Sequence, residues 1–171
     1  MKPEPHLTSP PPGARIRAQL SGAHFHDAWA VPAARPELSP LEQFLRAARA
    51  TPAWVESCMR LRNRLVQPFG LKNLGDMAAL QPNRSASAYG VGDRVGIFTL
   101  FEQHPDELLL GDRDRHLDVT LSVHQAGGVV TLTTVVHIHG LLGRLYMLPV
   151  APMHHLIAPA VLRKVGQPDS P

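Results

Sequence analysis

A glycine pair between two strand-forming segments constrains the fold of this chain more than any other feature. Apolar and polar residues alternate along residues 116–124, so that one face of an extended segment carries Leu117, Val119, Leu121 and Val123. Residues 129–139 (VVTLTTVVHIH) form a second such segment after Gly127 and Gly128. Glycine supplies the positive φ angles that a two-residue hairpin loop needs, so the sequence predicts an antiparallel hairpin here.

The register of this hairpin depends on which two residues form its loop. The loop can consist of Ala126 and Gly127 or of Gly127 and Gly128. In either register, the second strand adds its aliphatic side chains to the apolar face of the first, namely Val130, Leu132, Val136 and Ile138. The hairpin therefore presents one continuous buried face.

The opposite face of the hairpin gathers three histidines and one aspartate. With the glycine pair as the loop, His116 lies opposite His139 and Asp118 lies opposite His137; with the other loop, His116 lies opposite His137. Imidazole and carboxylate groups within cross-strand reach can bind zinc or another divalent ion, so these four residues are a candidate metal site. The alternative is a solvated outer face, or a face covered by another subunit. No other cofactor is predicted.

Further elements are predicted on both sides of the hairpin. Strands are expected at 23–31, 94–103 and 107–110, and helices at 39–50, 51–67 and 152–164. Three prolines interrupt the apolar segment near the C-terminus, so a turn or short helix at 141–148 is expected to precede a helix kinked at Pro159. Residues 71–93 lack sustained periodicity and predict a long connection.

Composition indicates one domain between two tails. Residues 1–18 contain five prolines and few apolar groups, which predicts a flexible tail, followed by a single domain at 19–165 and a second flexible tail at 166–171. The net charge of +3 is spread along the chain, which argues against nucleic-acid binding. The sequence shows neither a signal peptide nor an apolar run long enough for a membrane span, so a soluble, cytoplasmic protein is expected.

The predicted order of elements is that of a helix-grip fold. One strand, two short helices, an antiparallel meander and a last helix give an α+β domain in which a curved antiparallel β-sheet wraps around the C-terminal helix. The stretches that carry a closer match are HFHDAWAVP, WVESCMRLRNRLVQPFGLK and RHLDVTLSVHQAGGVVTLTTVVHIHGLLGRLYMLPVAPMHHLIAPAVLRK. They resemble the bacterial DUF2867 family, which is grouped with the START or Bet v 1-like (SRPBCC) domains. The resemblance covers about residues 23–165.

This resemblance implies a shape more than an activity, because the family has no established one. Related helix-grip domains hold lipids, sterols, polyketides or plant hormones in an apolar cavity, and a few convert their ligands. The leading hypothesis is therefore a small-molecule binding protein, with a cyclase- or isomerase-like enzyme as the alternative. Some family members are fused to an NmrA-like dinucleotide-binding domain. This chain has no G-x-G-x-x-G segment, so a third hypothesis is an interaction domain that works beside a separate dehydrogenase.

The resemblance also suggests which residues would contact a ligand, which is expected to be a small apolar or aromatic molecule. By strand and helix phase, the apolar walls of the cavity are expected to include Phe98, Leu100, Leu121, Leu132 and Leu156. Polar contacts, or acid and base groups of a reaction, are expected from Arg62, Tyr146 and His154 near the start of the last helix. Their alternative role is to cap and anchor that helix. No catalytic residue is assigned, and a homodimer is a further partner considered.

Overall fold

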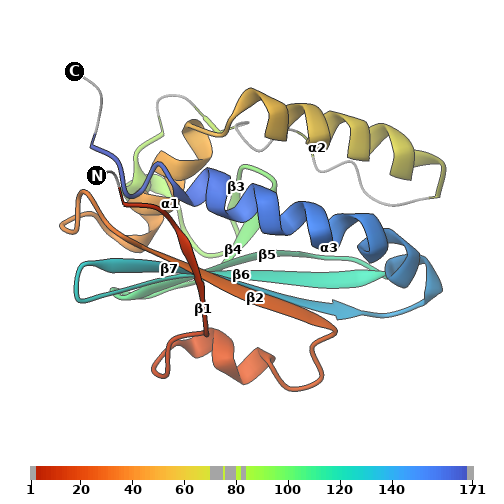
Figure 1. Ribbon diagram of the computed structural model, residues 1–171, viewed down its shortest axis with the longest axis horizontal. Helices are drawn as coiled ribbons and strands as arrows, with labels where there is room; N and C mark the ends of the chain where they lie inside the picture. Colours follow the sequence, from red (N-terminus) through yellow and green to blue (C-terminus); the bar gives the residue numbers. More distant parts are fainter. Residues whose placement is uncertain (1–2, 70–74, 76–79, 82–83, 169–171) are drawn as a thin grey trace.

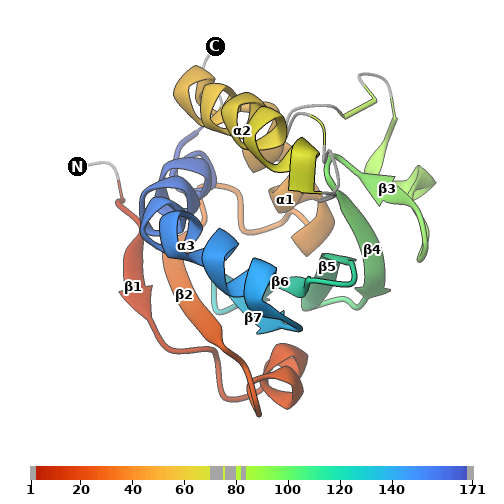
Figure 2. The ribbon, with the colours of Figure 1, turned by 90° about the vertical axis from the view of Figure 1, so that its right-hand side faces the viewer.

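The computed structural model describes residues 3–69, 75, 80–81 and 84–168. It is an α+β fold in which three α-helices lie on one face of a seven-stranded sheet (Figure 1). The last helix lies along the curved sheet, and two helices follow the strand Phe25–Pro32, as in a helix-grip fold (Figure 2). The predicted fold class is thus confirmed.

All neighbouring strands of the sheet are antiparallel, in the order β1-β2-β7-β6-β5-β4-β3. The strands are β1 (His6–Thr8), β2 (Phe25–Pro32), β3 (Arg94–Val95), β4 (Phe98–Gln103), β5 (Glu107–Arg113), β6 (Leu117–Ala126) and β7 (Val129–Ile138). A turn at Gly96 and Ile97 divides the single strand predicted at 94–103 into β3 and β4, because Gly96 adopts a φ of 62°.

The β6–β7 hairpin adopts the register in which the glycine pair forms the loop. Gly127 and Gly128 have φ angles of 57° and 76°, and Ala126 pairs directly with Val129. At the far end of the hairpin, the His139 amide donates to the His116 carbonyl oxygen over 2.8 Å. The apolar side chains of both strands therefore share one face, as predicted.

Both predicted helices after β2 are present. They are α1 (Pro40–Arg49) and α2 (Ala53–Val66), followed by a 3-10 turn, η2 (Gln67–Phe69). A capping box begins α1: the Glu42 amide donates to the Ser39 hydroxyl, and the Ser39 amide donates to the Glu42 carboxylate. A further 3-10 turn, η3 (Ala86–Ala88), falls within the predicted connection 71–93, most of which lies outside the described residues.

The C-terminal helix differs from its prediction. Instead of a short helix and a second, kinked one, α3 runs without interruption over Leu141–Leu162 and contains Pro149, Pro152 and Pro159. A proline removes only its own amide donor and leaves one carbonyl oxygen in the preceding turn without its helical partner. Pro149 and Pro152 are exposed, so water can bind the freed oxygens on that side.

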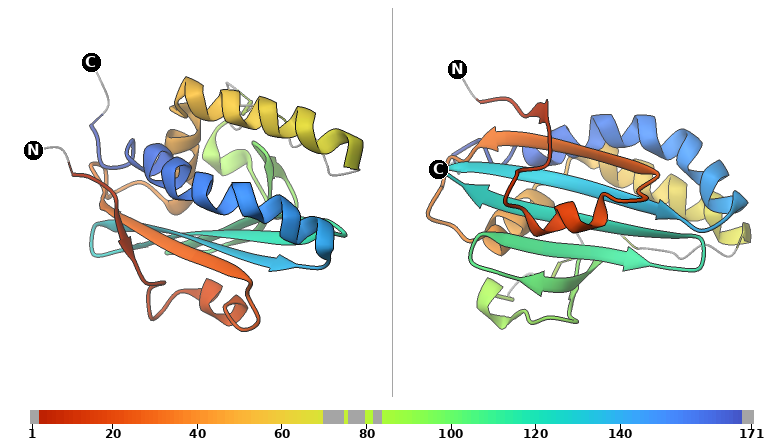
Figure 3. Two further views of the ribbon diagram at one scale, coloured as in Figure 1. Left: turned by 45° about the vertical axis from the view of Figure 1, so that its right-hand side comes forward. Right: turned by 90° about the horizontal axis from the view of Figure 1, so that it is seen from below.

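The N-terminal segment, predicted as a tail outside the domain, instead packs on the sheet. β1 pairs with β2, and the 3-10 helix η1 (Arg15–Gln19) lies across the outer face of the sheet (Figure 3). Ile16 is fully buried, and the amides of Arg15 and Ile16 donate to the Glu107 carboxylate over 2.5 and 3.2 Å. The prediction was wrong here because a proline-rich composition does not indicate that Ile16 and the two amides contact the sheet.

The second predicted tail also begins as ordered chain. Gly166 is buried close to Val31, and the Gln167 carbonyl accepts a hydrogen bond from Arg46. Residues 169–171 lie outside the described part of the chain.

Two apolar cores lie on opposite faces of the sheet. The larger one lies on the face of the sheet that the helices cover and includes Leu41, Phe98, Leu110, Val130 and Val161. The smaller one lies beneath η1 and contains Ala14, Ile16, Leu109 and Val135. The start of α3 is held close to the sheet by Gly143, where a Cβ atom would come within 2.5 Å of the His116 carbonyl oxygen.

Candidate ligand-binding cavity

A cavity of about 620 Å³ lies between the helical layer and the sheet. Its floor is formed by the alternating apolar side chains of the hairpin, and its walls by α2 and α3. On β6 the lining runs from Leu117 to Val123, and six steps along a strand cover about 20 Å. The volume falls within the range of small-molecule sites, and the shape suits an elongated molecule.

The mouth of the cavity is apolar as well. Leu61 and Leu65 of α2 and Leu145 of α3 line the cavity, yet their side chains are also exposed to solvent. In α2 only Val55 and Val66 are buried, although the helix contains several other large apolar residues. These exposed leucines of α2 and α3 therefore border an opening of the cavity. The two helices lie above the sheet (Figure 2).

Three of the five predicted wall residues line the cavity. Phe98, Leu121 and Leu132 do so. Leu100 is fully buried within the larger core and is not part of the lining. Leu156 is 60% exposed on the outer side of α3, so its prediction as a wall residue was wrong.

The error at Leu156 is one of helical phase. Successive residues of an α-helix point about 100° apart. Met153, Ile157 and Val161 line the cavity at helical spacing, which turns Leu156 toward solvent. Because the predicted helix began later and was kinked, the sequence did not define which arc would face the sheet.

Two of the predicted polar residues, Arg62 and Tyr146, meet at one end of the cavity. The Arg62 Nε atom donates to the Tyr146 hydroxyl over 3.0 Å, and the guanidinium carbon lies 5.2 Å from the Tyr146 ring centroid. Both residues line the cavity. This contact joins the end of α2 to the start of α3, which is the anchoring role considered as the alternative, while leaving polar groups beside the apolar lining.

The third predicted polar residue, His154, belongs to a hydrogen-bonded cluster in the cavity wall. Its Nε2 atom lies 3.0 Å from the Thr134 hydroxyl and 3.1 Å from the Asp27 carboxylate. The other Asp27 oxygen accepts a hydrogen bond from Trp29 Nε1 over 3.0 Å and lies 3.4 Å from His155 Nδ1. Asp27 is 6% exposed, so this carboxylate is held almost entirely by protein groups.

Sequence reasoning missed Asp27, although a signal for it was present. Phe25 and Trp29 share one face of the predicted strand, and Asp27 lies between them on that same face. A carboxylate at an apolar position of a strand is costly unless it is paired. The sequence pattern did not identify the partner of Asp27, which is His154 on α3.

The surroundings of Asp27 stabilise its charged form. Burial raises the pKa of the carboxyl, but the hydrogen bonds and charges of His154, together with Trp29 and His155, outweigh that effect. The net pKa is below the ordinary value for aspartate. Asp27 is therefore placed to orient the His154 ring through their 3.1 Å contact.

A buried amide lies at the other end of the cavity. The Gln43 side chain is fully buried and lines the cavity, and its Nε2 atom donates to the Arg35 carbonyl oxygen over 2.7 Å. That bond fixes the amide orientation, and Oε1 has no hydrogen-bond partner within the described part of the chain. The cavity thus has polar groups at both ends and in the middle, separated by apolar surface.

The predicted metal site is not assembled. His139 Nε2 lies 3.2 Å from Asp118, but His116 accepts a hydrogen bond from Arg115, and His137 faces the Ser21 carbonyl oxygen at 3.4 Å. Over residues 3–69, 75, 80–81 and 84–168, no group of three or more potential ligand side chains is placed to hold a metal ion. His116 and His137 instead contact Arg115 and the Ser21 carbonyl oxygen, and the strand register alone does not reveal these contacts.

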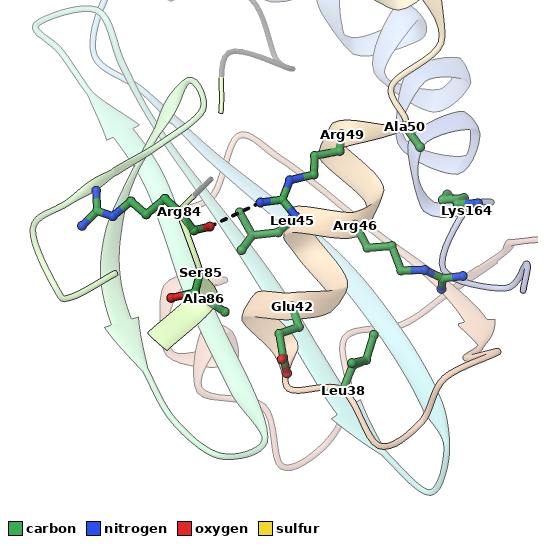
Figure 4. Close-up of a pocket in the computed structure, with 10 residues that line it drawn as sticks. All are labelled: Leu38, Glu42, Leu45, Arg46, Arg49, Ala50, Arg84, Ser85, Ala86 and Lys164. Carbon is green, nitrogen blue, oxygen red and sulfur yellow. Dashed lines mark hydrogen bonds between the residues drawn. The ribbon is translucent and has the colours of Figure 1, made fainter. Parts of the chain in front are cut away.

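A second hollow, of about 550 Å³, lies beside α1 and is lined by several basic residues (Figure 4). Arg49 donates to the Arg84 carbonyl oxygen, and Arg46 donates to the carbonyls of Val165 and Gln167. The Arg84 guanidinium points away from the other lining side chains (Figure 4). It pairs with the Asp93 carboxylate. Since these arginines are already engaged, the hollow is a weaker candidate than the cavity.

Comparison with known proteins gives a family but no activity. The sequence model of one family, described as "Protein of unknown function (DUF2867)", matches residues 19–161. The chain belongs to the DUF2867 family. The family prediction is confirmed, and the match spans β2 and α1 through most of α3, which are the elements that enclose the cavity. No curated protein and no solved structure matches this DUF2867 chain.

By length and composition alone, α3 of this DUF2867 protein could cross a membrane, since its most apolar window has a mean hydropathy of 1.4. A core helix of a soluble protein passes the same test, so one such helix is weak evidence for a span. Here α3 lies lengthwise on the sheet as part of the folded domain (Figure 1), and 22% of that window is buried.

Proposed function

We propose that this DUF2867 protein binds an elongated, mainly apolar or aromatic small molecule in the cavity between the sheet and α2 and α3. The observation that carries the proposal is the cavity itself: about 620 Å³, an apolar lining, and a few polar groups at defined positions. A DUF2867 chain with this architecture fits the START or Bet v 1-like superfamily, and we include that assignment in the proposal.

Native mass spectrometry of protein purified gently from its own host tests this proposal. The expected result is a retained small molecule that is released on unfolding. Binding of N-phenyl-1-naphthylamine, a neutral aromatic fluorophore, provides a quantitative second test. Absence of both a retained molecule and fluorophore binding would contradict the proposal.

A cavity-filling variant makes the fluorophore test specific for the site. Val119 is half-buried in the floor of the cavity, so Val119→Trp would fill part of the cavity and weaken fluorophore binding about tenfold or more. Val91→Trp is the matched control, because Val91 is 68% exposed and does not line the cavity. Equal binding by both variants would show that the fluorophore occupies another place.

A cyclase- or isomerase-like activity is the second candidate, favoured by the Asp27–His154 pair. A histidine that lines an apolar cavity and is oriented by a buried carboxylate is arranged as a general acid or base. The molecule recovered from the host would be incubated with fresh protein and analysed for isomerisation. If this activity exists, His154→Gln should retain binding and lose conversion; an unchanged rate would rule out His154.

A further inference from the structure

Several exposed leucines lie on the two helices that border the mouth of the cavity. Six leucines on α2 and α3 are 58–78% exposed, and one of them, Leu156, lies about two turns farther along α3. The other five are the leucine rim: Leu61, Leu65, Leu141, Leu145 and Leu148. On each helix they recur three or four residues apart, so each set forms a stripe along one side. Contiguous exposed apolar patches of this kind mark interaction surfaces.

Basic residues accompany the leucine rim. Arg60 and Arg64 on α2 and Arg144 on α3 are exposed, within one helical turn of rim leucines. The only acidic residue of α2 is Glu56, and α3 contains none. Arg60 donates to the uncharged Ser57 hydroxyl, so its positive charge is not neutralised by that contact. The surface around the mouth therefore combines leucine side chains with positive charge.

We infer that the leucine rim docks on an anionic lipid bilayer, with the leucines in the acyl boundary and Arg60, Arg64 and Arg144 at the headgroups. Apolar side chains flanked by arginines are the pattern of interfacial membrane binding. Anionic headgroups attract each nearby basic residue by about 1 kcal/mol, or roughly fivefold in affinity. The charges argue against a second copy of the chain, because pairing two rims would bring like charges together.

Docking in this orientation would turn the mouth of the cavity toward the membrane. A poorly soluble molecule could then pass between bilayer and cavity without crossing water. The docking itself rests on exposed side chains and not on the cavity contents. It can therefore be tested separately from the proposed function.

Vesicle flotation tests the docking with the full chain. The protein is mixed with vesicles of phosphatidylcholine alone or of phosphatidylcholine with phosphatidylglycerol. We expect flotation with the anionic vesicles, weakened by added salt, and little with the neutral ones. Lack of flotation with anionic vesicles at low salt would overturn the inference.

Three variants make this test specific. Leu141→Ser/Leu148→Ser should weaken binding about tenfold or more, and neither residue lines the cavity, so fluorophore binding should persist. Arg60→Gln/Arg144→Gln should weaken it by roughly twentyfold to thirtyfold, as two fivefold steps. Val91→Ser, at an exposed apolar residue in the chain before β3, is the control and should bind as the unmodified protein does.

Two outcomes would assign the surface differently. Equal flotation by the leucine variant and the control would show that the rim is not the docking surface. Concentration-dependent dimerisation, abolished by Leu141→Ser/Leu148→Ser and seen without vesicle binding, would identify a second copy as the occupant. Either outcome overturns the inference, and neither affects fluorophore binding in the absence of vesicles.

Discussion

Replacing Asp27 with alanine should destabilise this DUF2867 domain more than its side-chain volume suggests. The substitution removes the acceptor for Trp29 Nε1 and His154 Nε2 and the charge beside His155. Removing one partner of a buried charged pair costs about 3–5 kcal/mol, and hydrogen bonds to charged groups contribute about 1.5–3 kcal/mol each. Because His154 is only partly buried and His155 is exposed, the lower end is appropriate, about 3 kcal/mol.

Thermal and urea unfolding followed by circular dichroism can measure this loss. For a chain of this size, about 3 kcal/mol corresponds to a melting temperature lowered by roughly 6–12 °C. Asp118→Ala is the matched control, since Asp118 also faces a histidine at 3.2 Å but both side chains are substantially exposed. That exposed pair should contribute less than about 1 kcal/mol. If Asp27→Ala lost no more stability than Asp118→Ala, the reasoning about the buried cluster would be refuted.

Three further predictions concern the same architecture. Folding lowers the pKa of Asp27, so its stabilising contribution should be complete at neutral pH and decline as the pH falls below about 4. In urea unfolding experiments, the stabilities of Asp27→Asn and of the unmodified protein should therefore become more similar in acid. Gly143→Ala should cost about 1–3 kcal/mol, because the new methyl group would meet the His116 carbonyl oxygen and Ile138; a variant as stable as the original would contradict the close packing of α3. Deleting residues 1–18 should cost about 3 kcal/mol, since it removes the buried Ile16 and two amide donors of Glu107, and unchanged urea unfolding would show that this segment does not stabilise the sheet.

Local patterns were sufficient to predict most of the sheet and the first two helices. Alternation and the glycine pair predicted the hairpin, and Ser39 with Pro40 marked the start of α1. Patterns failed where the outcome depends on a distant partner. Ile16 is buried only because β5 and β7 present Leu109 and Val135 beneath it, and these contacts leave no local signal among the prolines.

The candidate site was predicted in part for the same reason. Leu121 and Leu132 follow from strand alternation, which is fixed once the register is known. Leu156 failed because helical phase needs a defined helix start, and three prolines obscured it. Asp27 was missed because its partner His154 is more than a hundred residues away in the sequence.

The two edges of the sheet also limit how these domains can associate. β1, at one edge, is three residues long, and β3, at the other, is two. Edge strands this short offer few free backbone groups to an incoming strand, which is a common protection against edge-to-edge aggregation. Joining of sheets from two molecules into one larger sheet is therefore disfavoured, and assembly would have to proceed through the helical side or the surface around η1.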